Sequence, residues 1–558
     1  MNVNANDGAT PFDWEQLRPK PSDWLETHFR YTGDGTAELT APRGTIAGTF
    51  IAEFDEYGSS SIETVFPNIS PCDADYENNP IAFLSGAKPQ RSGKATTWGI
   101  GVDSDNPCES LSFVTAHGTF MSTGTVAQNA LSWGTGPTRI RFFVREGKFE
   151  TSSARPAKYF AIPLFNCVAE PTNQLHGQHP LRIFPTPSIP DDVPSERKQI
   201  ASMVANEMNS VLAFLIDGRL CFVERLPDYK ARVAELKSGA AQRKITAVLV
   251  GDIGSNPVAN LADFRSWFPS GIFSALSFAS GVEVGWPWIE IRDEQGGLIR
   301  RLHGDARVPS FFEGDNVFGK FSRPGAGEFV ASFATLPKEK RTYLQVVMNH
   351  ARLGSLGPHL YLPDLLAHLV RALDCLCREH HVTSRVLTAG LSAEAKNKLN
   401  ELTTEFTTKL KRLSDYSKQS GNLEDHSLLG TITRRAESIG QKANVLGLAA
   451  VELLKKFDFS DASVLDRFLT AKGRPDWATL ISTYRNATIH EGYLDFSNKH
   501  DVNEVIQICA HLKDVLTRII LKECEYSGTY DSVLRHSYGP QAIDWVRPDT
   551  NASDLRFT

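Results

Sequence analysis

The sequence lacks several features that would define a protein class at once. No apolar run reaches the roughly 18 residues that a membrane-spanning helix needs, so we expect none. None of the eight cysteines forms a CxxC pair, and their scattered positions predict mostly buried thiols in a reducing compartment. Positive charge is not in excess, because the net charge is −6. This balance disfavours a protein that coats nucleic acid along its whole surface, while leaving room for a local basic site.

The N-terminal segment MNVNANDGATPFDWEQ has no basic stretch followed by an apolar one. It therefore does not resemble a signal peptide, and we expect a cytoplasmic protein. The chain of 558 residues, 41% hydrophobic and 22% charged, has the composition of a globular protein and exceeds the length of one compact core.

The hydrophobic period divides the chain near residue 335. Before this point, β-branched and aromatic residues predict strands at 43–58 and 244–252. Alternating segments predict hairpins at 138–150, turning at Glu146-Gly147, and at 288–302. Two helices are expected near 195–212 and 259–268. We interpret residues 1–335 as one large β-rich domain or two smaller ones.

Helical spacing dominates residues 336–558. Pro363 suits a first helical turn, and five leucines after it recur at steps of three and four. Residues 393–418 are charged and predict an exposed helix or a helical insertion. A last amphipathic helix carries Val505, Ile508, Leu512, Val515, Leu516 and Ile519 on one face. The predicted fold class is α+β multidomain, with β-rich N-terminal domains followed by an all-α bundle.

The segment TYRNATIHEGYLDF (483–496) carries the strongest candidate site. Pro475-Asp476 favours a helix start and Gly492 a helix end, which places Arg485, Asn486 and His490 in its last two turns. Arginine binds phosphate as a fork, and histidine can transfer a proton near neutral pH. In RNA, the ribose 2′-hydroxyl is an internal nucleophile, so this chemistry needs no metal. A single helix end supplies one proton carrier, and a two-fold dimer would supply two. The alternative is that these are ordinary exposed residues of a helix end.

RNATIHEG, late in an all-α region and followed by one long amphipathic helix, resembles the signature of the HEPN superfamily over about residues 360–525. The layout of a β-rich region before this bundle is similar to ApeA-type anti-phage proteins. The resemblance implies a metal-independent endoribonuclease without cofactor, acting as a homodimer or higher homo-oligomer in abortive infection. It implies that Arg485 holds the phosphate, His490 is general base or acid, and Asn486 orients the site. The N-terminal region would restrain it until a phage-derived trigger arrives.

Glu437 is a candidate for the acidic residue that many HEPN domains carry on an earlier helix. Arg434 and Arg435 beside it could contact RNA or form a solvated face. Two other functions remain open: a non-catalytic HEPN scaffold for dimerisation or ligand binding, and a carbohydrate- or peptide-binding β domain with a helical dimeriser.

Other polar clusters in the sequence are weaker candidates for a functional site. His176, His179 and Cys167 lack a fourth zinc ligand nearby. Asp103 and Asp105 form a D-x-D that fits a loop better than a nucleotidyltransferase site.

The segment GDIGSNP (251–257) follows a predicted strand but lacks the lysine of a phosphate loop, which favours a turn. Cys375 and Cys377 are two apart on a predicted helix, so they do not face each other as a redox pair.

Overall fold

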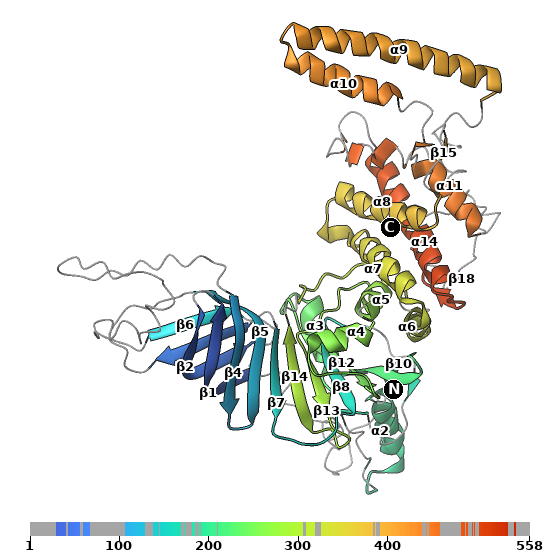
Figure 1. The fold of residues 1–558 in the computed structure, drawn as a ribbon. Helices are drawn as coiled ribbons and strands as arrows, with labels where there is room; N and C mark the ends of the chain where they lie inside the picture. The colour runs from blue at the N-terminus through green and yellow to red at the C-terminus, as the bar shows by residue number, and fades with distance from the viewer. Residues whose placement is uncertain are drawn as a thin grey trace, which may run out of the picture. The chain divides into compact units, whose positions relative to one another are not determined.

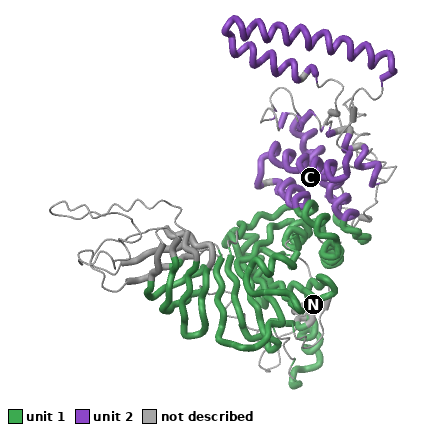
Figure 2. The backbone as a smooth tube through the Cα atoms, in the orientation of Figure 1, with its two compact units in different colours: residues 1–345, 524–531 green, residues 346–523, 532–558 purple. Residues whose placement is uncertain are grey.

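A computed structural model gives the fold (Figure 1). It describes residues 29–40, 43–55, 60–66, 107–128, 138–143, 146–168, 173–174, 181–184, 189, 191–208, 210–269, 271–304, 308–318, 325–382, 385–386, 391–437, 442–443, 446–457, 481, 483–485, 487–488, 494, 496, 501–533 and 541–542. The chain divides into two compact units, coloured in Figure 2. Unit 1 comprises residues 1–345 and 524–531, and unit 2 comprises residues 346–523 and 532–558. The sequence pattern predicts a single boundary at 335/336, whereas residues 524–531 return to unit 1.

The described helices and strands follow an α+β order. The strands are β1 (Phe29–Thr40), β2 (Arg43–Phe54), β3 (Ser60–Phe66), β4 (Pro107–Thr115), β5 (Gly118–Gln128), β6 (Thr138–Phe143), β7 (Glu146–Thr151), β8 (Tyr159–Phe165), β9 (Asn173–Gln174), β10 (Ser210–Ile216), β11 (Arg219–Arg225), β12 (Ile245–Asp252), β13 (Trp288–Arg292), β14 (Leu298–Gly304), β15 (Arg385–Val386), β16 (Lys442–Ala443), β17 (Thr529–Tyr530) and β18 (Gln541–Ala542). The helices are α2 (Ser195–Met208), α3 (Tyr229–Lys237), α4 (Leu261–Trp267), α5 (Gly271–Ser280), α6 (Gly325–Thr335), α7 (Lys338–Leu353), α8 (Leu362–Glu379), α9 (Ala393–Gln419), α10 (Leu423–Glu437), α11 (Leu446–Lys456) and α14 (Val502–Glu523). A 3₁₀ turn spans Gly357–His359. No helix in these ranges is long and apolar enough to cross a membrane.

Unit 1 contains a 14-stranded sheet in the order β4-β1-β2-β3-β6-β5-β7-β14-β13-β8-β12-β11-β10-β9. The additional pairing of β4 with β5 closes the first six strands into a ring. In β1 the side chains alternate strictly, with Phe29 and Tyr31 buried and Arg30 and Thr32 exposed. This period of two directs the aromatic side chains into one shared core.

The remaining strands of the sheet carry helices. β8 and β12 are buried almost throughout, as continuous apolar strands are when both faces are covered. α3 packs against β12, α4 against β14, and α6 against β10 and α5. The predicted strands at 43–58 and 244–252 are confirmed as β2 and β12, and the predicted helices as α2 and α4.

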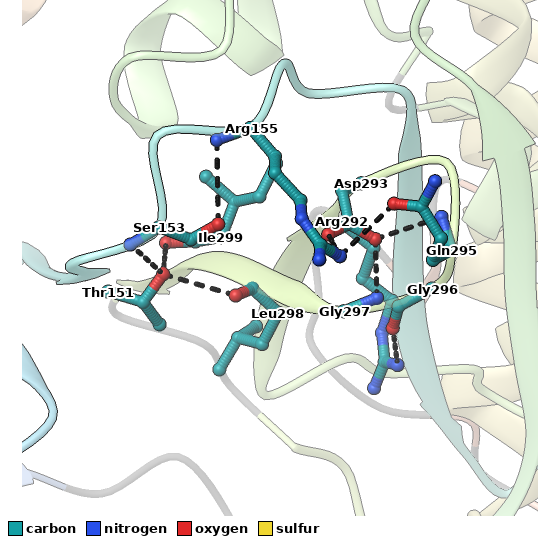
Figure 3. A network of polar contacts seen from close by, with 10 residues as sticks. All are labelled: Thr151, Ser153, Arg155, Arg292, Asp293, Gln295, Gly296, Gly297, Leu298 and Ile299. Carbon is teal, nitrogen blue, oxygen red and sulfur yellow. Dashed lines mark hydrogen bonds and ion pairs between the residues drawn. The ribbon is translucent and has the colours of Figure 1, made fainter.

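The hairpin predicted at 288–302 is confirmed as β13–β14 (Figure 3). The carboxylate of Asp293 accepts hydrogen bonds from the Gln295 and Gly297 amides at 3.0 and 2.7 Å, and from the guanidinium of Arg155 at 3.0 Å. Gly296 has a φ of +81°, a left-handed conformation that favours glycine. The side chain of Asp293 therefore builds the turn.

The hairpin predicted at 138–150 is wrong. β6 ends at Phe143 and β7 begins at Glu146, so Glu146-Gly147 lies inside a strand. β6 pairs with β3 and with the end of β5, whereas β7 pairs with β5 and β14. The two segments alternate as hairpin arms do, but long-range partners take up both strands.

A buried ion pair lies within the apolar interior of unit 1. Oε1 of Glu290 accepts hydrogen bonds from Nε and Nη2 of Arg301 at 2.9 and 2.7 Å. Nη1 of Arg301 donates to the Tyr31 hydroxyl at 2.8 Å, and its guanidinium lies 3.7 Å from the centre of the Phe29 ring. Burial, followed by the charge of Arg301, lowers the pKa of His303 well below its usual range. Oε2 of Glu290 accepts from Arg292 at 2.6 Å, so both carboxylate oxygens are hydrogen-bonded, and this lets the charged groups occupy an aromatic core.

Unit 2 is helical. The predicted leucine face is confirmed on α8, where Leu365, Leu366, Leu369, Leu373 and Leu376 are buried, and Pro363 lies in its first turn. α8 packs against α11 and α14. His380, after α8, lies 2.6 Å from the carboxylate of Glu523 at the end of α14. α9 and α10 form an antiparallel hairpin, and α9 coincides with the charged helix expected near 393–418.

Candidate functional site

The described part of the RNATIHEG segment is helical, and one of its faces is buried within unit 2. Ile481, Tyr484 and Ala487, at steps of three, are buried with exposed fractions of 4% or less. Thr483 is exposed, and Arg485 is half-buried between these two faces. Asn486 and His490 lie outside the described residues. The structure therefore fixes the position of Arg485 and the burial of its neighbours, and the rest of the proposed triad remains a prediction.

A hydrogen bond between two buried side chains holds this segment. The hydroxyl of Tyr484 donates to the carboxylate of Glu504, which lies in the first turn of α14. Asp501 precedes that turn, and its side chain accepts from the amide of Asn503 at 2.9 Å. The positive end of the helix dipole favours a carboxylate at this place. Because Arg485 follows Tyr484 directly, this bond sets the position of the arginine backbone.

The helix changes its winding after Arg485. Ala487 and Thr488 are in π-helical conformation, and the hydroxyl of Thr488 donates to the carbonyl oxygen of Tyr484. A π turn accommodates one more residue than an α turn, and such turns are frequent at functional sites. In general, residues five apart come closer to one face across a π turn than along a regular α-helix.

The two accessory candidates lie on α10. The carboxylate of Glu437 is 2.6 Å from Nζ of Lys411 on α9, and its side chain is 43% exposed. Arg434 is exposed and donates to Gly430 and Thr431 of its own helix at 3.4 and 3.3 Å. These contacts give both residues a role within the α9–α10 hairpin, and no described contact joins either to Arg485.

A stripe of ionisable residues on α14 escaped the sequence reasoning. Glu504, His511, Asp514 and Arg518 are buried and recur at steps of seven, three and four, so they share one side of the helix. The apolar face expected for this helix is confirmed, because Val505, Ile508, Leu512, Val515, Leu516 and Ile519 are buried. The same steps of seven, three and four were the signal that could have revealed the polar stripe.

Burial perturbs the titratable groups of α14. It lowers the pKa of His511 to about 4, with a further decrease from the charge of Arg518. It also lowers the pKa of Lys513 to about 7, against the opposing effect of Asp514. The hydroxyl of Ser532 donates to the Asp514 carboxylate at 2.6 Å. α14 thus carries several buried ionisable groups through the interior of unit 2.

The weaker motifs carry no site within the described residues. Asp103, Asp105, His176 and His179 lie outside them, and Cys167 is a buried free thiol. Across the described ranges there is no group of three or more His, Cys, Asp or Glu that could hold a metal ion.

One further expectation from the sequence is confirmed. The 251–257 segment turns at Gly254, whose φ is +60° and whose amide donates to Asp252 at 2.6 Å. Cys375 and Cys377 both lie on α8 as free thiols.

No protein-family model matches the chain, and neither the curated proteins nor the solved structures include a significant match. The resemblance to the HEPN superfamily therefore rests on the motif and its helical context.

Proposed function

We propose that this chain is a metal-independent endoribonuclease of the HEPN type that acts in anti-phage defence. Its catalytic residues are Arg485, Asn486 and His490, contributed by both protomers of a homodimer. The observation that carries the proposal is the RNATIHEG motif, in which the described Arg485 is half-buried on a helix held by the Tyr484–Glu504 bond.

The proposed reaction uses the ribose as nucleophile. One His490 imidazole removes the proton of the 2′-hydroxyl, and the 2′-oxygen attacks the adjacent phosphorus. The bond from phosphorus to the 5′-oxygen breaks, and the His490 of the second protomer donates a proton to that oxygen. Arg485 binds the non-bridging oxygens and stabilises their growing negative charge. The products are a 2′,3′-cyclic phosphate and a 5′-hydroxyl.

Three features support this assignment. A buried hydrogen bond restricts the segment, which is the preorganisation that a catalytic arginine requires. The π turn favours convergence of residues five apart. A half-buried guanidinium attracts a phosphate more strongly than a fully hydrated one, because the local dielectric constant is lower.

The first test uses the full-length protein with total RNA and EDTA in extract from phage-infected cells, which supplies the proposed trigger. We expect the wild type to produce discrete fragments with cyclic phosphate ends. His490→Ala and Arg485→Ala should each slow cleavage by about 100-fold or more, the usual contribution of a proton-transfer group or of a preorganised charge. Arg434→Ala is the matched control, because this arginine is exposed and bonded to its own helix. It should cleave as the wild type does.

The proposed restraint by the N-terminal region has a separate readout. The wild type should be silent on RNA alone and active in extract from phage-infected cells, and the His490→Ala variant should be silent in both. Cleavage without infection would refute the restraint and leave the ribonuclease standing. Absence of cleavage by the wild type both on RNA alone and in the extract from infected cells would favour the non-catalytic scaffold.

A further inference from the structure

The α9–α10 hairpin hides small residues and exposes large apolar ones. Between the two helices lie Thr407, Ser414 and Ser417 of α9, with Thr433 and Ala436 of α10, all buried. The hydroxyls of Thr407 and Thr433 donate to carbonyls of their own helices at 2.8 Å, so they add little attraction between the helices. The seam between the helices therefore buries little apolar surface.

Large apolar side chains are exposed beside these buried residues, and four of them, Phe406, Leu413, Tyr416 and Ile432, come directly before a buried residue. We call them the apolar stripe: Leu402, Phe406, Leu413 and Tyr416 of α9, and Leu428 and Ile432 of α10. Their exposed fractions range from 45% to 68%. One position is a rotation of about 100°. Since the helices are antiparallel, this rotation turns the large side chains of α9 and those of α10 toward the same side of the hairpin. An exposed apolar face of this size on one side of a helix pair indicates an interaction surface.

The charges of α9 identify the partner. Glu401 and Glu405 border the stripe in the first half of the helix, and Arg412 borders it in the second half on the same outer flank. An antiparallel copy of α9 can set Leu402 against Tyr416 and Phe406 against Leu413. In this register Glu405 lies one to two positions from Arg412 of the copy. Lys409 falls near the two-fold axis, and its charge is already paired with Glu405 at 2.6 Å. The surface is complementary to itself.

We propose that the apolar stripe is an isologous interface between two copies of this chain, in which α9 packs antiparallel to its counterpart. Such packing covers the stripe with the same surface of the second protomer, as a two-fold interface requires. The interface is distinct from the contact that the ribonuclease proposal requires at Arg485 and His490, and it stands whether or not the chain cleaves RNA.

The experiment measures the mass of the full-length protein by sedimentation and light scattering. Phe406→Glu with Leu413→Glu should weaken association by at least about 100-fold and halve the mass of the assembly, because the new charges would face each other across a dry contact. The control Thr404→Glu with Thr408→Glu adds the same charges to exposed positions on the opposite side of α9 and should leave the mass unchanged. Circular dichroism verifies the helical content of each variant.

Two further variants test the antiparallel arrangement. Glu405→Arg alone should reduce association, and adding Arg412→Glu should restore it. Lys409→Cys should form a disulfide-linked dimer on mild oxidation, whereas Thr404→Cys should not. An unchanged mass for the double glutamate variant, or the absence of the Lys409→Cys cross-link in a wild-type-sized assembly, overturns the proposal and means that another partner covers the stripe.

Discussion

Replacing Tyr484 with phenylalanine removes one oxygen from the contact that positions Arg485. The ring keeps its place, because Tyr484 is 3% exposed and phenylalanine has the same shape. The carboxylate of Glu504, 9% exposed, loses the hydroxyl that donates to it. We therefore expect the segment around Arg485 to open more readily without a change in the fold.

The size of the effect follows from the cost of removing one partner of a buried, charged hydrogen bond. That cost is about 1–3 kcal/mol, which corresponds to a roughly 5- to 150-fold increase in the population of the open state. Hydrogen exchange measured by mass spectrometry on a peptide spanning 481–488 reports this population directly. Glutamine at position 504 retains an acceptor without charge, so Glu504→Gln should have a smaller effect than Tyr484→Phe.

The matched control is Tyr361→Phe, the same chemical change at a tyrosine that is 84% exposed. It should leave exchange in the 481–488 peptide unaltered. If Tyr484→Phe also leaves exchange unaltered, the bond to Glu504 does not hold the segment. Under the proposed function, RNA cleavage by Tyr484→Phe should fall together with the protection from exchange.

Three further outcomes are expected. Glu290→Gln should destabilise unit 1 by about 3–5 kcal/mol, because Arg301 stays buried without its counter-charge. Urea unfolding followed by tryptophan fluorescence measures the change, and Glu294→Gln, at an exposed position of the same hairpin, should show none. Lys513→Met should raise the thermal midpoint most near pH 7 and progressively less toward pH 10. The reason is that the pKa of Lys513 is about 7 in the folded state and 10.5 in the unfolded state. Between these values the unfolded chain binds more protons, so wild-type stability rises with pH. A difference in thermal midpoint that does not vary with pH contradicts this reasoning, and Lys398→Met is the exposed control. A fragment of residues 336–558 should aggregate in light scattering where the full chain does not. It lacks Phe318 and Phe329, whose rings lie 5.4 and 6.4 Å from the ring of Tyr526, so Tyr526 loses these apolar neighbours. A monodisperse fragment would show that unit 2 tolerates this loss.

Elements with a local cause were predictable from the sequence. The β13–β14 turn depends on Asp293 and Gly296 within the turn itself, and the start of α8 depends on Pro363. α5 was missed because nearly all of its residues are buried, so its sequence GIFSALSFAS shows no polar face to reveal a helical period. At 138–150 a period of two was present, but it does not say which strands pair. Two alternating segments look like a hairpin whatever strands they pair with.

The candidate site was predictable only in part. Residue types and spacing select Arg485 and its neighbours, but the partner of Tyr484 is Glu504, beyond the end of the motif. The return of residues 524–531 to unit 1 depends on contacts of Tyr526 with residues far earlier in the chain. Such long-range pairings leave no periodic signal in the sequence, and they decide both where the site is held and where the chain can be cut.

The closure of β4 onto β5 bears on how this protein resists polymerisation. An extended sheet ordinarily has two terminal strands, whose free amides and carbonyls can recruit further chains into fibrils. Here the strand at one terminus, β4, is paired on both sides, and the strand at the other is β9, which comprises only Asn173–Gln174. β9 pairs with only Ser210 and Val211 of β10, so among the described residues the outer edge of β10 from Leu212 to Ile216 has no strand beside it. The closure onto β5 thus removes one of the two edges at which templated growth could begin, and the edge along β10 is the one that remains.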